Sequence, residues 1–126
     1  DSFDVVTSAF MMRNVPDVRQ ALREQVRVIR PGGTLVCLEI TWPRHFPINW
    51  LFTLYFSGLT PLLGSLMTGD REAYTYLPRS VRRFMDPEAL AEEMHKVGLC
   101  DISWTSMMMG TVAIHTGVKK VSKSDL

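Results

Sequence analysis

The hydrophobic residues of the N-terminal third form two short runs separated by an amphipathic stretch. FDVVTSAF at 3–10 and TLVCLEI at 34–40 are apolar without polar alternation, which predicts two strands buried on both faces. The segment between them predicts a helix with one apolar face, because its apolar residues recur at three- and four-residue intervals: Val18, Leu22, Val26 and Ile29. A strand, a helix and a strand of this kind form a right-handed crossover in a parallel sheet that is covered on both sides.

Local signals bound this first helix. Asp17 and Gln20 have the spacing of a capping box at its start. Pro31, Gly32 and Gly33 are expected to end it.

The C-terminal part predicts another helix and two further strands. Asp86 has the position of a cap for a helix that starts at Pro87 and ends at Gly98. DISWTSM at 101–107 and TVAIHTGV at 111–118 read as strands, and their short connection allows only antiparallel pairing. The apolar face of the predicted helix consists of Leu90, Met94 and Val97. The fold class is therefore α/β, with a mostly parallel sheet and one antiparallel strand at its end.

A long uncharged stretch, FPINWLFTLYFSGLTPLLGSLMTG at 46–69, follows the second strand. Its length suits a membrane span, which needs about 20 apolar residues. Five residues that weaken an apolar helix interrupt it: Pro47, Asn49, Gly58, Pro61 and Gly64. We therefore expect two short helices, at about 49–57 and 61–67, instead of a span. Core filling accounts for part of the stretch, but its place beside the ligand end of the sheet favours an aromatic lid that holds a lipid and rests against a bilayer.

Composition narrows the classes of function. With 46% hydrophobic and 21% charged residues and a net charge of +1, the 126 residues are typical of one soluble globular domain, and no basic field indicates a nucleic-acid partner. The chain opens on the acidic DSFD instead of a signal peptide, so we expect a cytoplasmic protein. Cys37 and Cys100 lie in apolar runs and are expected to be buried thiols. The histidines lack metal-ligand spacing, so no metal site is predicted.

Three motifs in a fixed order resemble one enzyme family. RVIRPGGTLVCLEIT at 27–41, MMRNVPD at 11–17 and GTVAIHTG at 110–117 are similar to segments of the C-methyltransferases of ubiquinone and menaquinone biosynthesis, the UbiE-type family. Arg30 and Thr41 replace the family's usual Lys and Ser. The resemblance covers nearly the whole chain. It implies a Rossmann-like, class I S-adenosylmethionine-dependent methyltransferase fold, with the insert at about 45–84 as a helical lid.

The resemblance also indicates what this sequence lacks. A class I methyltransferase starts with a strand, a Gly-rich loop and an acidic residue that hold the cofactor. No such glycine cluster is present, and DSFDVV matches the family's fourth strand. We therefore interpret residues 1–126 as the C-terminal half of such a domain, without the first strands and inactive alone. The strand at 3–10 would then leave an open apolar edge, which predicts self-association or a missing N-terminal half.

The resemblance implies a cofactor wall and a catalytic pair. Ser8, Ala9 and Phe10, at the end of the first strand, are expected to lie beside S-adenosylmethionine. The family commonly has Ser at the position of Ala9, so Ser8 is a candidate to supply that hydroxyl. Arg13 and Asn14 are the predicted catalytic residues, because a guanidinium and an amide beside a ring oxygen favour the phenolate that a ring carbon needs for methylation. The alternative is a solvated Arg13 and a turn-forming Asn14.

Further residues are assigned to the substrate side or left open. The insert at about 45–84 supplies the predicted substrate-binding residues: Trp50, Phe52, Tyr55, Tyr74, Tyr76 and Arg79. Arg82 and Arg83 are expected to be solvated. Glu39 either faces the site or makes a structural hydrogen bond. Asp17 is expected to be a helix cap instead of a base.

Three hypotheses follow. The first is S-adenosylmethionine-dependent C-methylation of a prenylated quinol, either demethylmenaquinol or its ubiquinone counterpart, by a cytoplasmic protein that touches the inner face of the membrane. The second is a class I methyltransferase of another small apolar molecule. The third is an inactive fragment or partner subunit.

Overall fold

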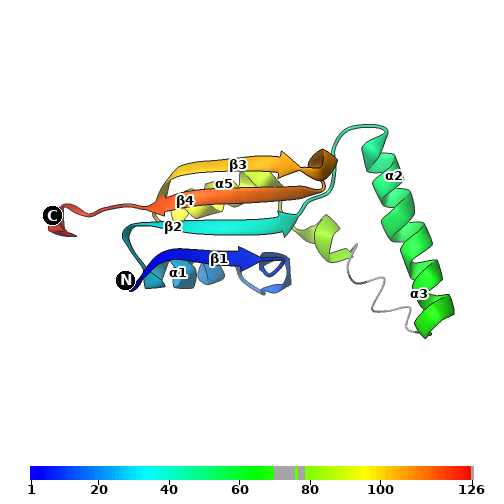
Figure 1. Ribbon diagram of the computed structural model, residues 1–126, viewed down its shortest axis with the longest axis horizontal. Helices are drawn as coiled ribbons and strands as arrows, with labels where there is room; N and C mark the ends of the chain where they lie inside the picture. Colours follow the sequence, from blue (N-terminus) through cyan, green and yellow to red (C-terminus); the bar gives the residue numbers. More distant parts are fainter. Residues whose placement is uncertain (70–75, 77–78, 126) are drawn as a thin grey trace.

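The computed structural model describes residues 1–69, 76 and 79–125. Four strands form one sheet, and the helices lie in the connections between them (Figure 1). In chain order the main elements are β1 (Phe3–Ala9), α1 (Val18–Val28), β2 (Ile29–Ile40), α2 (Ile48–Leu54), α3 (Thr60–Thr68), α5 (Pro87–Lys96), β3 (Leu99–Met107) and β4 (Val112–Lys119). Short turns of 3-10 helix occur at Met12–Asn14, Met108–Gly110 and Lys123–Asp125. The predicted α/β class is confirmed.

The sheet has the order β1-β2-β4-β3. β1 is parallel to β2, whereas β4 is antiparallel to both of its neighbours, as the short β3–β4 connection requires. The last strand of the chain is therefore the antiparallel one, as predicted. Its place is different: β4 lies inside the sheet, between β2 and β3, and β3 forms the edge.

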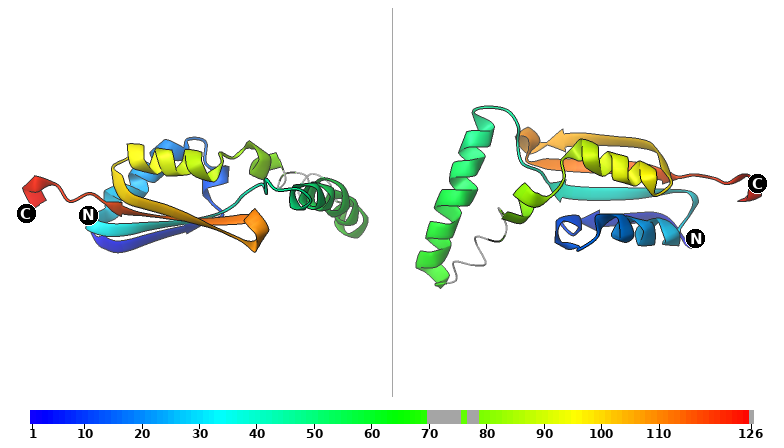
Figure 2. Two further views of the ribbon diagram at one scale, coloured as in Figure 1. Left: turned by 90° about the horizontal axis from the view of Figure 1, so that it is seen from above. Right: turned by 180° about the vertical axis from the view of Figure 1, so that it is seen from behind.

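Both covering helices lie on the same face of this sheet (Figure 2). The expectation of cover on both faces is wrong for the described residues, and the handedness of the crossovers explains why. The connection from β1 through α1 to β2 and the connection from β2 through α5 to β3 both move in the same direction along the sheet. Right-handed crossovers that move in one direction place their helices on one side. The other face, which includes Val36 and Leu38, has no covering helix among the described residues.

Helix α1 starts as predicted and ends earlier. The Asp17 carboxylate accepts a hydrogen bond from the Gln20 backbone N–H at 3.0 Å, which caps the first turn. The helix ends at Val28, and β2 begins at once with Ile29, so the Pro-Gly-Gly segment lies inside the strand instead of in a turn. Gly33 permits this course, because a Cβ there would lie 2.7 Å from the Asp4 carbonyl oxygen.

Helix α5 starts at Pro87 as predicted and ends at Lys96, two residues before Gly98; it joins α1 over the core. The Asp86 carboxylate accepts a hydrogen bond from the Ala89 N–H at 2.9 Å, and Gly98, at φ 99°, follows the end of the helix. Arg19 of α1 forms a two-pronged ion pair with Glu93 of α5 at 2.7 and 3.0 Å, which lowers the pKa of that carboxyl to about 2. Beneath the helices lies the core: Met12, Leu22, Val26, Ile29, Leu35, Cys37, Leu90, Met94 and Leu99.

The uncharged insert forms one continuous helix instead of the two predicted. Ile48–Met67 is helical over 20 residues, with a π-helical turn at Tyr55–Leu59 between α2 and α3. Pro61 does not break the helix because it lies next to this wider turn, where the Thr60 N–H already bonds back to the Tyr55 carbonyl oxygen. By length and composition alone this helix is able to cross a membrane, and only 11% of its apolar window is buried. Core filling is therefore wrong for this stretch, which stands apart from the sheet (Figure 1).

The free edge of β1 confirms another expectation. Among residues 1–69, 76 and 79–125, β1 pairs with β2 alone, and no strand pairs with its outer side. Phe3 and Val5 on this strand are 56% and 53% exposed. The strand is therefore an apolar edge in the described chain and not a strand buried on both faces.

Candidate active site

The chain turns sharply where β1 ends. Phe10 adopts a left-handed conformation, with φ at 56°, while its N–H still bonds to the Leu38 carbonyl oxygen at 2.9 Å. This turn directs the following residues across the carboxyl end of β2, where the 3-10 turn Met12–Asn14 begins. Arg13 and Asn14 therefore lie at the carboxyl edge of two parallel strands, which is where ligands collect in open α/β sheets.

Glu39 holds this turn from below. Alternation along β2 places Leu35, Cys37 and Glu39 on the covered face, and Glu39 is only 1% exposed. Its carboxylate accepts one hydrogen bond from the Met12 N–H at 2.7 Å and another from Arg13 Nη1 at 3.2 Å. These two hydrogen bonds to a buried carboxylate fix the position of the turn. The structural-bond interpretation of Glu39 is correct, and its bond to Arg13 also ties it to the site.

Arg13 is accordingly neither solvated nor freely mobile. Its side chain is 11% exposed, and Nη1 also donates to the Phe10 carbonyl oxygen at 3.1 Å. The guanidinium carbon lies 6.0 Å from the centre of the Phe10 ring. The Arg13 charge is therefore oriented by its neighbours at the end of β1.

Asn14 is connected to a residue far along the chain. Its amide nitrogen donates to the Phe10 carbonyl oxygen at 3.3 Å, and its amide oxygen accepts a hydrogen bond from the Tyr76 hydroxyl at 2.7 Å. The structure thus brings together four predicted site residues, namely Phe10, Arg13, Asn14 and Tyr76, although 62 positions separate Asn14 from Tyr76.

The end of β1 carries Ser8, Ala9 and Phe10, the three residues predicted to lie beside S-adenosylmethionine. Ala9 and Phe10 are exposed at the strand end. Ser8 points to the covered face of the sheet and pairs with Cys37 in the register of β1 and β2. Its hydroxyl is buried and has no nitrogen or oxygen partner among the described residues. Burial raises the pKa of the Cys37 thiol, and the Ser8 hydroxyl opposes this shift. Ala9 and Phe10 are therefore accessible at the strand end, whereas Ser8 is half-buried behind them.

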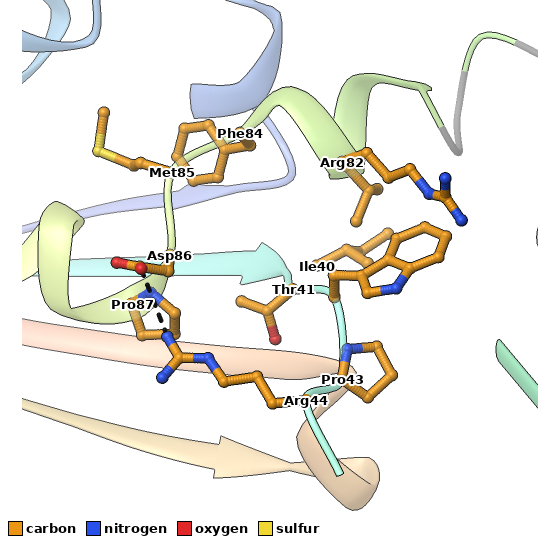
Figure 3. Close-up of a pocket in the computed structure, with 11 residues that line it drawn as sticks. Ile40, Thr41, Pro43, Arg44, Arg82, Phe84, Met85, Asp86 and Pro87 are labelled. Carbon is orange, nitrogen blue, oxygen red and sulfur yellow. Dashed lines mark ion pairs between the residues drawn. The ribbon is translucent and has the colours of Figure 1, made fainter. Parts of the chain in front are cut away.

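One cavity includes Arg13 in its lining, and it shares two lining residues with a second, larger cavity. One, of about 240 Å³, is lined by Met12, Arg13 and Val15 together with Phe84 and Met85. Another, of about 490 Å³, lies at the carboxyl end of β2 and is lined by Trp42, Arg82 and the same Phe84 and Met85, among others (Figure 3). The larger cavity is within the range of about 300 to 1,000 Å³ that is typical of small-molecule sites.

The residues of the insert lie farther away. Trp50 and Tyr55 are exposed on the α2–α3 helix, and Arg79 is exposed before α5. Phe52 is half-buried and contacts the Trp42 ring with 4.9 Å between ring centres. Tyr74 lies outside the described residues. Phe52 therefore contacts a residue that lines the larger cavity, whereas Trp50, Tyr55 and Arg79 are exposed.

Sequence reasoning missed the residues that shape the larger cavity. Arg82 is exposed, as expected, but its guanidinium also lies 4.3 Å from the centre of the Trp42 ring, a contact that the sequence does not predict. Trp42 follows the end of β2 by two positions, and this place at the carboxyl end of a parallel strand was the available signal. Nothing in the local pattern connects Phe84 and Met85 with Arg13.

Known proteins resemble this chain in sequence. The sequence model of the ubiE/COQ5 methyltransferase family matches residues 1–119. Demethylmenaquinone methyltransferase of Roseiflexus castenholzii is 42% identical over 120 residues, which are 95% of this chain and 50% of the relative. The ubiquinone/menaquinone biosynthesis C-methyltransferase UbiE of Hahella chejuensis is 44% identical, with 94% and 48% covered. Human mitochondrial 2-methoxy-6-polyprenyl-1,4-benzoquinol methylase is 40% identical, with 94% and 36% covered. The chain thus spans about half the length of its bacterial relatives.

Solved structures agree on the fold. A SAM-dependent methyltransferase from Thermotoga maritima has a TM-score of 0.61 at 17% identity, with 94% of this chain and 57% of that chain covered. The phosphoethanolamine N-methyltransferase 2 of Haemonchus contortus, in complex with S-adenosylhomocysteine, has a TM-score of 0.60 at 11% identity, with 94% and 34% covered. These similarities show the Rossmann-like class I methyltransferase fold.

Proposed function

This chain belongs to the ubiE/COQ5 methyltransferase family, and from that premise we propose that it supplies the substrate side of an S-adenosylmethionine-dependent enzyme that methylates a ring carbon of a prenylated quinol. The substrate would be demethylmenaquinol or its ubiquinone counterpart, as the names of the relatives indicate. The observation that carries the proposal is the anchored Arg13, held by Glu39 and the Phe10 carbonyl at the carboxyl edge of the sheet.

The proposed chemistry requires an electron-rich ring. S-adenosylmethionine supplies an electrophilic methyl group when it is bound, with Ala9 and Phe10 as one wall of its site. Loss of a phenolic proton to solvent makes the ring carbon nucleophilic, and the Arg13 guanidinium favours that phenolate by a charge-assisted interaction. Transfer of the methyl group to this carbon would release S-adenosylhomocysteine, and the carbon would then lose its own proton to solvent and regain an aromatic ring. Tyr76 fixes the amide of Asn14, which sets the position of the second polar group beside the ring oxygen. These residues orient the ring and stabilise its charge.

Replacement of Arg13 tests this role in the full-length protein. Arg13→Lys keeps a charge but loses the fork geometry, and Arg13→Ala loses both, so we expect kcat for quinol methylation to fall by about 10²- to 10³-fold in Arg13→Ala. Arg23→Ala, on the exposed side of α1, is the matched control and should leave the rate unchanged. Unchanged methylation by Arg13→Ala would remove Arg13 from the mechanism.

Assays of the same full-length protein also distinguish the two alternative functions. Methylation of small apolar phenols without methylation of any quinol would favour a methyltransferase of another substrate. Failure to bind S-adenosylmethionine in isothermal calorimetry, in the presence of the remainder of the domain, would favour an inactive fragment or partner subunit.

We further propose that the open β1 edge and the bare sheet face are covered by the N-terminal half of the domain or by a second copy of this chain. The support is the exposed apolar edge and the roughly twofold length of the bacterial relatives. Sedimentation of residues 1–126 alone should show self-association, and a clean monomer would contradict this.

The α2–α3 helix is proposed as a peripheral contact with the cytoplasmic face of a membrane. It presents an uncharged, largely exposed apolar surface that includes Leu62 and Leu66. Each leucine that enters the interface contributes about 1.5 kcal/mol or more, which is about tenfold in partitioning.

Cosedimentation with phosphatidylcholine vesicles measures this contact. Leu66→Lys should weaken binding about tenfold, whereas Met108→Lys, at an equally exposed methionine of the β3–β4 turn, should not. Wild-type protein that stays in the supernatant would refute the contact, and resistance to alkaline carbonate extraction would indicate a span instead.

A further inference from the structure

The larger cavity, at the carboxyl end of β2, is lined by apolar side chains and by charged ones, among them Arg44, Arg82 and Asp86. Side chains of Ile40, Trp42, Val81, Phe84 and Met85 provide its hydrophobic walls (Figure 3). Val81 is only 3% exposed, so this part of the wall is well buried. These apolar walls are the part of the cavity that suits a hydrocarbon group.

The charges at the cavity are paired. Arg44 forms ion pairs with Asp86, at 3.6 Å, and with Glu88. Arg82 lies flat over the face of the Trp42 ring, where its charge interacts with the ring electrons. Because these charged groups already have partners, the cavity offers no strong site for a charged ligand.

The larger cavity and the cavity at Arg13 share part of their walls. Phe84 and Met85 line both the larger cavity and the Arg13 cavity. The Arg13 cavity, at about 240 Å³, is smaller than the range of about 300 to 1,000 Å³ for a small-molecule site. A ligand whose polar ring lies at Arg13 and whose apolar substituent is long has to extend past these two side chains.

On its other side the cavity leads to the exposed helix. The Trp42 ring contacts Phe52 edge-on, with centres 4.9 Å apart, and Phe52 contacts Phe56 at 4.4 Å. These rings form an apolar row from the cavity to the α2–α3 helix. A chain that leaves the cavity along this row passes the Arg82 guanidinium at the Trp42 ring and then reaches the apolar surface of that helix.

We infer that the Trp42 cavity binds the first isoprene units of the quinol's prenyl tail, with the ring at Arg13 and the remainder of the tail along Phe52 and Phe56. The inference rests on the proposed function and deepens it, and it agrees with the polyprenyl benzoquinol in the name of the human relative. Trp42, Val81 and Met85 thereby become the residues that select for a tail.

Chain-length selectivity in the full-length protein tests the inference. The probes are a naphthoquinol with a geranyl side chain and one with an ethyl side chain, both kept reduced. Val81→Phe fills the cavity and should raise KM for the geranyl quinol about tenfold while leaving KM for the ethyl quinol unchanged. Val121→Phe makes the same chemical change at an exposed valine outside the cavity and should alter neither value.

A second variant protects the test from a folding defect. Trp42→Ala removes one wall and the start of the aromatic row, so it should also raise KM for the geranyl quinol selectively. If Val81→Phe does not fold, Trp42→Ala decides alone. Equal effects on both quinols in both variants would overturn the inference, as would a wild-type protein with the same KM for both. A wild-type protein that methylates neither quinol would instead overturn the proposed function, and the inference with it.

Discussion

Replacement of Glu39 by Gln perturbs the anchor of the candidate site without changing its size. The native carboxylate is 1% exposed and accepts hydrogen bonds from the Met12 N–H at 2.7 Å and from Arg13 Nη1 at 3.2 Å. A hydrogen bond that involves a charged group contributes about 1.5 to 3 kcal/mol. Gln retains one acceptor and turns an NH2 group toward the other donor, so the unfolding free energy should fall by about 1.5 to 3 kcal/mol. Glu39→Ala leaves the Arg13 charge unpaired and should cost about 3 to 5 kcal/mol.

Equilibrium urea denaturation of the chain, followed by circular dichroism, measures these losses. Glu24→Gln is the matched control, because Glu24 also pairs with an arginine, Arg27, at 2.9 Å, but both side chains are more than half exposed. An exposed pair of this kind contributes about 0.3 to 0.5 kcal/mol. If Glu39→Gln and Glu24→Gln lose equally little stability, the anchoring role of Glu39 is refuted.

Two further predictions concern stability. Gly33→Ala should destabilise the chain by about 1 to 3 kcal/mol in the same urea assay, because its Cβ would lie 2.6 Å from Ile29 Cγ2 and 2.7 Å from the Asp4 carbonyl oxygen; Gly58→Ala, whose Cβ meets nothing closer than 3.9 Å, should not destabilise it. Burial lowers the pKa of His115, so the unfolded chain takes up a proton near its ordinary pKa of about 6.5 while the folded chain does not. The unfolding free energy should therefore be highest above about pH 6.5 and fall as the pH drops below it. In His115→Gln, the unfolding free energy measured at a series of pH values should depend less on pH in this range.

Several features of the fold could be predicted because their causes are local. The caps at Asp17 and Asp86 depend on a side chain and an N–H three positions away, so sequence spacing is sufficient to find them. The antiparallel pairing of β3 and β4 follows from the short connection between them. The continuity of the α2–α3 helix was mispredicted because Pro61 and Gly58 count as helix breakers, whereas a π-helical turn accommodates them.

Some residues of the candidate site could likewise be predicted from local motifs, and others could not. Arg13 and Asn14 could be found from their motif, and the resemblance to a quinol methyltransferase family was carried by three short segments that the comparisons confirm over residues 1–119. Glu39 was ambiguous in the sequence, since a single carboxylate in an apolar strand is compatible with either a ligand contact or a structural bond. Its partner Arg13 lies 26 positions away in sequence, and the bond between them forms only because β1 and β2 lie side by side.

Local signals thus specify most of the elements, their caps, the fold class and the family, because hydrophobic periodicity, turn chemistry and short motifs all act within a few residues. The tertiary structure decided which residues meet. It placed both helices on one face of the sheet, because both crossovers wind in one direction, and it joined Tyr76 to Asn14 and Arg82 to Trp42. These contacts depend on chain paths over tens of residues, which no local pattern specifies.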